Sequence, residues 1–133
     1  MKTILFVDDE PVSTEALRAV LEADGFRCKS LTDVTAAMSF LRREDVSVLV
    51  SDIMMPGGDD FPEIDSSEAG FNLVSLVQRE FPDVSIICLS VIGDQDKINK
   101  LKRRGVQYLR KGETPLGTAV KLIESKATGI IRF

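Results

Sequence analysis

The feature that most constrains the fold is a regular alternation of short apolar runs with longer segments of helical periodicity. Five runs are typical of strands, at residues 4–7, 27–31, 46–50, 86–89 and 106–109. The run at 27–31 alternates charged and apolar side chains, as an edge strand does, whereas the others are mostly apolar. Such an alternation predicts a parallel sheet with helices on both of its faces.

The segments between and after these runs predict five helices. We expect helices that begin near Pro11, near Thr32 or Asp33, before Phe71 and at about Asp96, and a last one capped by Thr114, with Pro115 first and Leu116 on its buried face. The expected fold is α/β, a doubly wound five-stranded parallel sheet of order 2-1-3-4-5 with five helices. Residues 1–127 are expected to form one domain, and residues 128–133 a tail or linker.

Composition excludes several classes of function. The net charge of −4 gives no general reason to bind nucleic acid or an acidic membrane, and no apolar run approaches the length of a membrane span. Cys28 and Cys88 lie in strand-like segments, so we interpret them as buried thiols of a cytoplasmic protein. The chain has no histidine, so it lacks the commonest general base and carries no phosphohistidine of its own.

Reactive side chains follow the central strands at the point where each strand ends. Asp8 and Asp9 follow the first strand, Asp52 the third, Ser90 ends the fourth, and Lys111 follows the fifth. Ligands of doubly wound sheets bind beyond this carboxyl edge, so we expect these side chains to lie close together.

The expected cluster has a definite chemistry. Three carboxylates that converge repel one another, and a hard divalent cation relieves the repulsion. An all-oxygen site without histidine suits Mg²⁺. Lys111 supplies a further positive charge, and the hydroxyl of Ser90 is able to donate to a phosphoryl oxygen. Because phosphoryl transfer depends on positioning and on charge neutralisation, the cluster predicts that reaction.

These strand ends make the sequence resemble the receiver domain of two-component response regulators, over about residues 3–126. The motifs are Val7-Asp8-Asp9-Glu10-Pro11, Ser51-Asp52-Ile53-Met54-Met55-Pro56, Leu89-Ser90 and Tyr108-Leu109-Arg110-Lys111. The resemblance implies a flavodoxin-like fold similar to that of chemotaxis regulators. It also implies a phosphoprotein that catalyses only its own phosphorylation and dephosphorylation and is otherwise not an enzyme.

The resemblance implies Asp52 as the phosphoacceptor and Mg²⁺ as the cofactor. The ion is then held directly by Asp9, Asp52 and the backbone carbonyl of Met54, and by Asp8 through water. The implied phosphodonor is a histidine kinase or a phosphotransfer protein, which supplies the histidine that this chain lacks.

The resemblance also implies a switch. Lys111 pairs with the phosphoryl group, Ser90 contacts it, and Tyr108 turns inward together with Ser90. The implied partner is an output domain or protein that binds the face from the fourth helix to the fifth. A basic cluster at residues 97–104 lies on that face, and we interpret it as a solvated helix surface. No direct contact with nucleic acid or membrane is expected.

Three features depart from the family pattern. Gly112 follows Lys111 where proline is usual, and glycine permits a different loop path. Val91 follows Ser90 where a small residue is usual, and we expect it to narrow access to the phosphoryl group. The connection after Asp52 is longer than expected because of an acidic insertion at about residues 57–68.

The insertion allows two interpretations. Its five acidic residues are typical of a solvated, mobile loop. Alternatively, it is a lid or docking element, with Phe61 and Ile64 as anchors. Asp65 and Glu68 have the spacing of a capping box, which predicts that the following helix begins near Ser66.

Other functions of the same fold need other residues. A nucleotide- or flavin-binding module needs a glycine-rich or hydroxyl-rich loop after the first strand, where this chain has Asp8-Asp9-Glu10. A phosphatase with an aspartyl nucleophile needs a second acid close after the first, and the segment 52–54 lacks one. A degenerate receiver, an interaction module independent of phosphorylation, stays open because of Gly112 and the long insertion.

Overall fold

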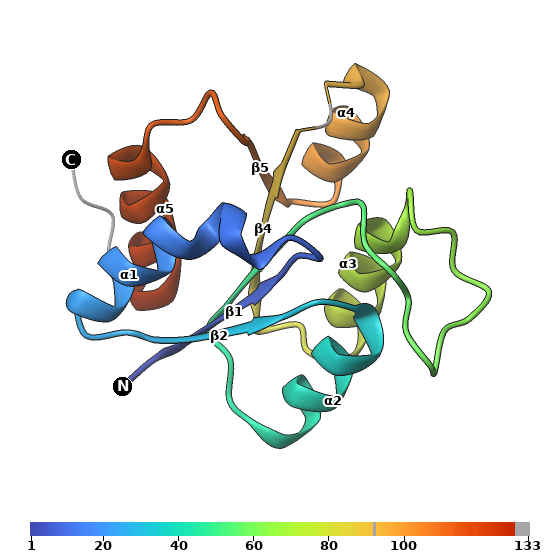
Figure 1. Cartoon of the computed structure of the whole chain (residues 1–133), viewed down its shortest axis with the longest axis horizontal. Helices are drawn as coiled ribbons and strands as arrows, with labels where there is room; N and C mark the ends of the chain where they lie inside the picture. Colours follow the sequence, from blue (N-terminus) through green and yellow to red (C-terminus); the bar gives the residue numbers. More distant parts are fainter. Residues whose placement is uncertain (92, 130–133) are drawn as a thin grey trace.

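The computed structural model describes residues 1–91 and 93–129. Within them, one parallel sheet has the strand order β2-β1-β3-β4-β5, as the sequence predicts (Figure 1). The strands are β1 Thr3–Val7, β2 Arg27–Leu31, β3 Val48–Ser51, β4 Ser85–Ser90 and β5 Gln107–Arg110. The expected fold class is therefore confirmed.

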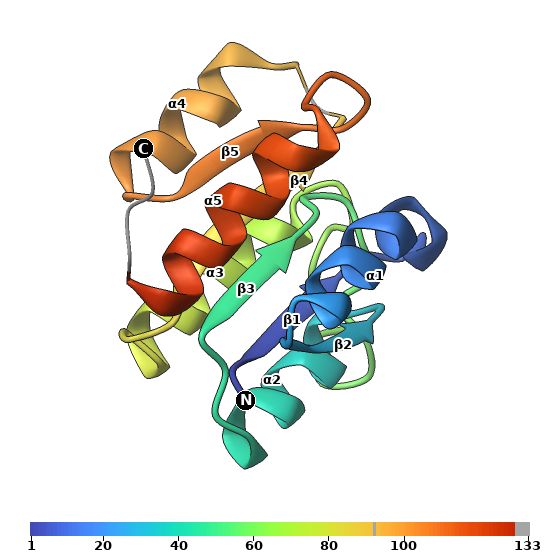
Figure 2. The same ribbon diagram turned by 90° about the vertical axis from the view of Figure 1, so that its left-hand side faces the viewer.

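The helices cover both faces of the sheet. They are α1 Glu15–Ala23, preceded by the 3-10 helix η1 Pro11–Thr14, then α2 Val34–Arg43, α3 Ala69–Glu80, α4 Gln95–Arg103 and α5 Leu116–Thr128. Figure 2 shows α1 and α5 on the near face of the sheet, with α3 behind it. Among the described residues, no helix is both long enough and apolar enough to cross a lipid bilayer.

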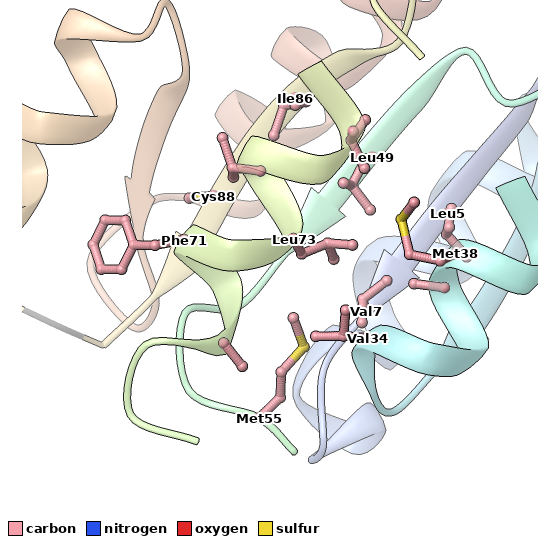
Figure 3. Packing of buried hydrophobic residues seen from close by; sticks show 14 of the residues in the cluster. Leu5, Val7, Val34, Met38, Leu49, Met55, Phe71, Leu73, Ile86 and Cys88 are labelled. Carbon is pink, nitrogen blue, oxygen red and sulfur yellow. The ribbon is translucent and has the colours of Figure 1, made fainter. Parts of the chain in front are cut away.

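The side chains of the apolar strands contribute to two hydrophobic clusters, one on each face of the sheet. Leu5 and Val7 point towards α2 and α3, while Ile4 and Phe6 point towards α1 and α5. Figure 3 shows the first cluster, in which Leu73 of α3 lies among side chains of the sheet and of α2. Because side chains alternate between faces, a strand buried on both faces must be apolar throughout. Because β1 is buried on both faces, its sequence does not alternate between polar and apolar residues.

The structure confirms the predicted cap of α2 and shifts that of α5. Asp33 caps α2, as expected, and its side chain accepts a hydrogen bond of 2.7 Å from the Ala36 amide. At α5, however, the N-cap is Pro115 and not Thr114, because the Thr114 amide still donates to Arg110 in the preceding turn. Leu116 therefore lies at the first helical position and is 45% exposed, so its predicted burial is wrong.

The predicted start of α3 near Ser66 is also wrong, because the helix begins at Ala69. The Asp65 carboxylate accepts from both the amide and the hydroxyl of Ser67, each at 2.9 Å, and so forms a local turn in place of a capping box. The hydrogen bond from the Ser67 amide, and then that from its hydroxyl, lower the pKa of Asp65.

The insertion packs against the body of the protein through its apolar residues. Phe61 and Ile64 are half-buried against the cluster between the sheet, α2 and α3, which attaches the insertion to the domain; its role as a lid or docking element stays a prediction. Its acidic residues are exposed. In Figure 1 the insertion forms the long green loop at the edge of the molecule, beside α2 and α3.

Part of the basic cluster is used to attach α4 to α3. The Lys100 ammonium lies 5.1 Å from the centre of the Phe71 ring. The Arg104 guanidinium donates to the Ser75 hydroxyl, and the Gln78 side chain donates to the Arg104 carbonyl at 2.8 Å. These contacts belong to the packing of α4 and leave the rest of the cluster on the outer surface.

Candidate functional site

The side chains predicted to converge do so at the carboxyl edge of the sheet. Asp8 follows β1, Asp52 follows β3 and Lys111 follows β5. The Lys111 ammonium donates to Asp8 Oδ2 at 2.5 Å and to Asp52 Oδ2 at 2.9 Å. The Lys111 ammonium therefore connects two carboxylates that lie far apart in the sequence, and both carboxylates are buried.

Asp8 is held by groups that follow it in the chain. Its Oδ1 accepts from the Glu10 amide at 2.8 Å, and its Oδ2 accepts from the Ser13 hydroxyl at 3.0 Å. The tight turn of η1, which begins at Pro11, carries Ser13 back towards Asp8. Sequence reasoning missed Ser13, because a serine in a first helical turn is usually only a local hydrogen-bonding residue.

Asp52 is fixed by its own loop. Its Oδ1 accepts from the Ile53 amide at 2.6 Å, and its own amide donates to the Val7 carbonyl at 2.9 Å. Gly70, near the start of α3, lies directly against this backbone, because a Cβ there would be 2.3 Å from the Asp52 carbonyl oxygen. Sequence reasoning missed Gly70 too, and an isolated glycine early in a predicted helix was the available sign of close approach.

The position of Lys111 is compatible with the glycine that follows it. The Lys111–Gly112 peptide is trans, and Gly112 adopts a φ of +80°, a conformation that favours glycine. Burial alone would lower the pKa of Lys111, but the hydrogen bonds and charges of Asp8 and Asp52 outweigh it and raise that pKa. The ammonium form is thus favoured at the point where the two carboxylates meet.

The acidic residues form a group with the chemistry of a cation site. Asp8, Asp9 and Asp52 each offer a carboxylate oxygen, and these three oxygens lie within 4.8 Å of one another. Asp9 is exposed, whereas the other two are buried. A set made only of oxygen atoms fits a hard divalent cation.

A cavity of about 580 Å³ opens next to this group, and Asp9, Asp52, Met54 and Lys111 line it on the charged side. Its apolar wall comes from α1, β4 and α5 and includes Leu17, Leu89, Leu116 and Ala119. Val91 lies on the same cavity and is 63% exposed, so it stands at the rim. The cavity gives Asp52 an approach from solvent.

Ser90 and Tyr108 are linked to each other beside the site. Ser90 is fully buried at the end of β4, and its carbonyl accepts from the Lys111 amide at 2.9 Å and from the Tyr108 hydroxyl at 3.3 Å. Burial, partly offset by the charge of Arg110, raises the pKa of Tyr108. The tyrosine is half-buried and packs against the α3 side of the core.

The comparison with protein families identifies this arrangement. Residues 4–121 match the sequence model of the response regulator receiver domain. The chain belongs to this family. As a receiver domain, it has a phosphoacceptor role in signalling.

Curated relatives and solved structures agree with this assignment. The response regulator GtcR of Aneurinibacillus migulanus is 31% identical over 121 residues, which are 91% of this chain and 46% of that protein. This receiver domain therefore spans less than half the length of that relative. Crystal structures with the same fold include a CheY-like receiver from Methanospirillum hungatei JF-1, with a TM-score of 0.80, 16% identity and coverage of 97% and 95% of the two chains. TrrA from Thermotoga maritima, in complex with Mg²⁺-BeF, has a TM-score of 0.73, 23% identity and coverage of 96% and 99%.

The thiols and the site lysine predict how the stability of this receiver domain depends on alkaline pH. Burial raises the pKa of Cys88 to about 12 and that of Cys28 to about 11, and the pKa values of Tyr108 and Lys111 are raised as well. In each case the unfolded chain loses its proton at a lower pH than the folded protein. The free energy of unfolding therefore falls as the pH rises above about 9.

Urea denaturation at pH 8 and pH 10 measures this effect. Cys88 alone is expected to contribute a loss of about 1 kcal/mol at pH 10, since its thiol ionises in the unfolded chain but not in the folded protein. The Cys88→Ala variant is less stable at pH 8 but should lose less stability between the two pH values. An identical loss in the variant and the wild type would contradict the buried, neutral thiol.

Proposed function

We propose that this receiver domain accepts a phosphoryl group on Asp52 from the phosphohistidine of a histidine kinase or phosphotransfer protein, in a Mg²⁺-dependent step in the cytoplasm. The observation that carries the proposal is the position of Asp52. Asp52 lines an open cavity, and the Lys111 ammonium donates hydrogen bonds to both Asp52 and Asp8. A nucleophilic carboxylate beside a fixed cation and an access route is the arrangement that phosphoryl transfer needs.

The donor set fits Mg²⁺. Asp9 and Asp52, together with the Met54 carbonyl, would hold the ion directly, and Asp8 would act through water; the close grouping of the three carboxylates supports this assignment. When bound, the ion neutralises negative charge at the site. TrrA of Thermotoga maritima, which shares the fold, was crystallised in complex with Mg²⁺-BeF, and this is further support.

In the proposed step, a carboxylate oxygen of Asp52 attacks the phosphorus atom. The new P–O bond forms as the P–N bond to the donor's imidazole breaks, and the imidazole nitrogen keeps the electron pair and takes up a proton. Lys111 moves its hydrogen bond from Asp52 to the phosphoryl oxygens, and the hydroxyl of Ser90 donates to them, with Tyr108 turning inward. The domain acts only on itself and turns over no separate substrate.

We place the output contact on the face formed by α4, β5 and α5. Tyr108 lies in β5 and is bonded to the carbonyl of Ser90, so a movement of Ser90 would reach this face directly. The partner is an output domain or protein, and the proposal assigns no nucleic-acid or membrane contact to the receiver domain itself.

Intact-mass spectrometry tests the proposal. The wild-type protein, incubated with Mg²⁺ and a small-molecule phosphodonor such as phosphoramidate, is expected to gain one phosphoryl group, and a chelator should prevent the gain. No gain with any small donor or kinase would favour a degenerate receiver that acts as an interaction module. Turnover of a substrate by the protein, with no change in the mass of the protein itself, would favour an enzyme.

A further inference from the structure

We infer that Thr35, at the second position of α2, is a positioning residue for the loop that carries Asp52, and that the insertion at residues 57–68 is the brace through which it acts. This inference rests on the proposed function, because the atom that the brace positions is the Met54 carbonyl, a proposed ligand of Mg²⁺. The Thr35 hydroxyl is hydrogen-bonded to Gly57 and Asp60, and not to the carboxylates of Asp8, Asp9 or Asp52.

The first two amides of α2 do not face solvent. The Val34 amide donates to the Pro56 carbonyl at 3.2 Å, and the Thr35 amide donates to the Gly57 carbonyl at 2.9 Å. The amides of a first helical turn have no partner within the helix, so they are free to bind another segment. Here they bind the end of the loop that begins at Asp52.

The hydroxyl of Thr35 adds two hydrogen bonds to this junction. It donates to the Gly57 carbonyl at 2.9 Å and accepts from the Asp60 amide at 2.9 Å. Thr35 thus connects the first residue of the brace with a residue in its first turn. A single hydroxyl that is both donor and acceptor fixes the path of the chain on either side of Gly58.

The brace packs tightly at this point. Gly58 has a φ of +86°, and a Cβ there would lie 2.6 Å from the Thr35 hydroxyl oxygen. A Cβ on Gly57 would lie 2.3 Å from the Phe61 carbonyl oxygen. The brace then turns back on itself through a hydrogen bond of 3.2 Å from the Ile64 amide to the Phe61 carbonyl.

The far end of the brace returns to the same loop. The Met55 amide donates to the Ser66 carbonyl at 2.9 Å. The Met55 side chain is buried, and Figure 3 shows it pointing towards Val34 and Leu73, between α2 and α3. On the other side of Met54, the Ile53 carbonyl accepts from the Gly70 amide at 2.7 Å. Met54 is therefore held between two fixed neighbours.

The expected effect on Mg²⁺ binding is about the size of one ordinary hydrogen bond, since only part of what the two hydrogen bonds of the Thr35 hydroxyl contribute is transmitted to Met54. Loss of the Thr35 hydroxyl lets residues 56–60 move and widens the range of positions open to the Met54 carbonyl, which is expected to weaken Mg²⁺ binding about fivefold. The carboxylates keep their own hydrogen bonds, so binding is weakened and not abolished.

The test compares three variants by isothermal titration calorimetry with Mg²⁺. Thr35→Val removes the hydroxyl but keeps the shape and should weaken binding about fivefold. Thr35→Ser keeps the hydroxyl, and Ser39→Ala changes an exposed position of the same helix, so both should bind Mg²⁺ as the wild type does. A purely structural role would lower the midpoint of urea unfolding in Thr35→Val without shifting the affinity for Mg²⁺.

Hydrogen exchange in the metal-free protein supplies a second readout. In Thr35→Val the amides of Met55 and Asp60 should exchange faster, while that of Leu49 in β3 should keep its wild-type rate. Unchanged affinity for Mg²⁺ in Thr35→Val overturns the inference, whatever the exchange rates show. A wild-type protein that binds Mg²⁺ but accepts no phosphoryl group defeats the proposed function alone, because calorimetry still ranks the variants.

Discussion

The Asp52→Asn variant is expected to gain no phosphoryl group under conditions that fully modify the wild-type protein. The amide keeps the shape of the side chain, and its single oxygen is able to keep the hydrogen bond from the Ile53 amide, while its NH2 group replaces the oxygen that accepts from Lys111. It is far less nucleophilic than a carboxylate, so transfer should stop while the fold is retained. Intact-mass spectrometry measures the loss, and urea denaturation checks that the variant folds.

A suitable control is Asp59→Asn, which changes an exposed acid of the insertion and leaves the site untouched. This variant should be phosphorylated as the wild type is. A phosphoryl group that remains on Asp52→Asn and maps to another residue by peptide mass spectrometry would show that Asp52 is not the acceptor.

The Gly70→Ala variant is expected to lose about 2–3 kcal/mol of stability and to bind Mg²⁺ poorly. The added methyl group would lie 2.3 Å from the Asp52 carbonyl oxygen and 2.4 Å from the Ile53 Cα. Both neighbours are backbone atoms, so neither can swing aside as a flexible side chain could. Either α3 or the Asp52 loop has to shift, and the hydrogen bond from the Gly70 amide to Ile53 is strained as a result.

Gly117→Ala provides the matched control. Gly117 lies in α5, and a Cβ there would meet no atom within 4 Å outside the adjoining residues and the backbone of its own helix. Alanine is favoured over glycine in helices, so this variant should gain up to about 1 kcal/mol. If urea denaturation showed Gly70→Ala to be as stable as Gly117→Ala, the close contact between α3 and the Asp52 loop would be refuted.

The fold and the main site residues could be predicted because each depends on a short-range pattern. Continuous apolar runs such as Ile4 to Val7 arise only when both faces of a strand are covered, and the alternation with helices then fixes a parallel sheet. Once the strands are known, Asp8, Asp52 and Lys111 must meet at one edge. Their convergence through a single ammonium follows from topology and not from any local motif.

The remaining features could not be predicted because they depend on the path of the backbone. Thr35 and Asp60 are distant in the sequence, and nothing in either residue indicates that the two are bonded. The starts of α3 and α5 were misplaced for a related reason. Asp65 and Thr114 both carry the side chains of helix caps, and the structure uses them in turns that precede the helices.

The cluster around Lys111 has a thermodynamic consequence for the whole domain. Folding gathers three carboxylates, those of Asp8, Asp9 and Asp52, around one ammonium, which leaves two negative charges in excess at a largely buried place. Their repulsion opposes folding. A cation that binds this cluster and not the unfolded chain raises the free energy of unfolding by RT ln(1 + [L]/Kd). The acidic cluster therefore also makes the stability of the folded domain depend on the concentration of divalent cations around it.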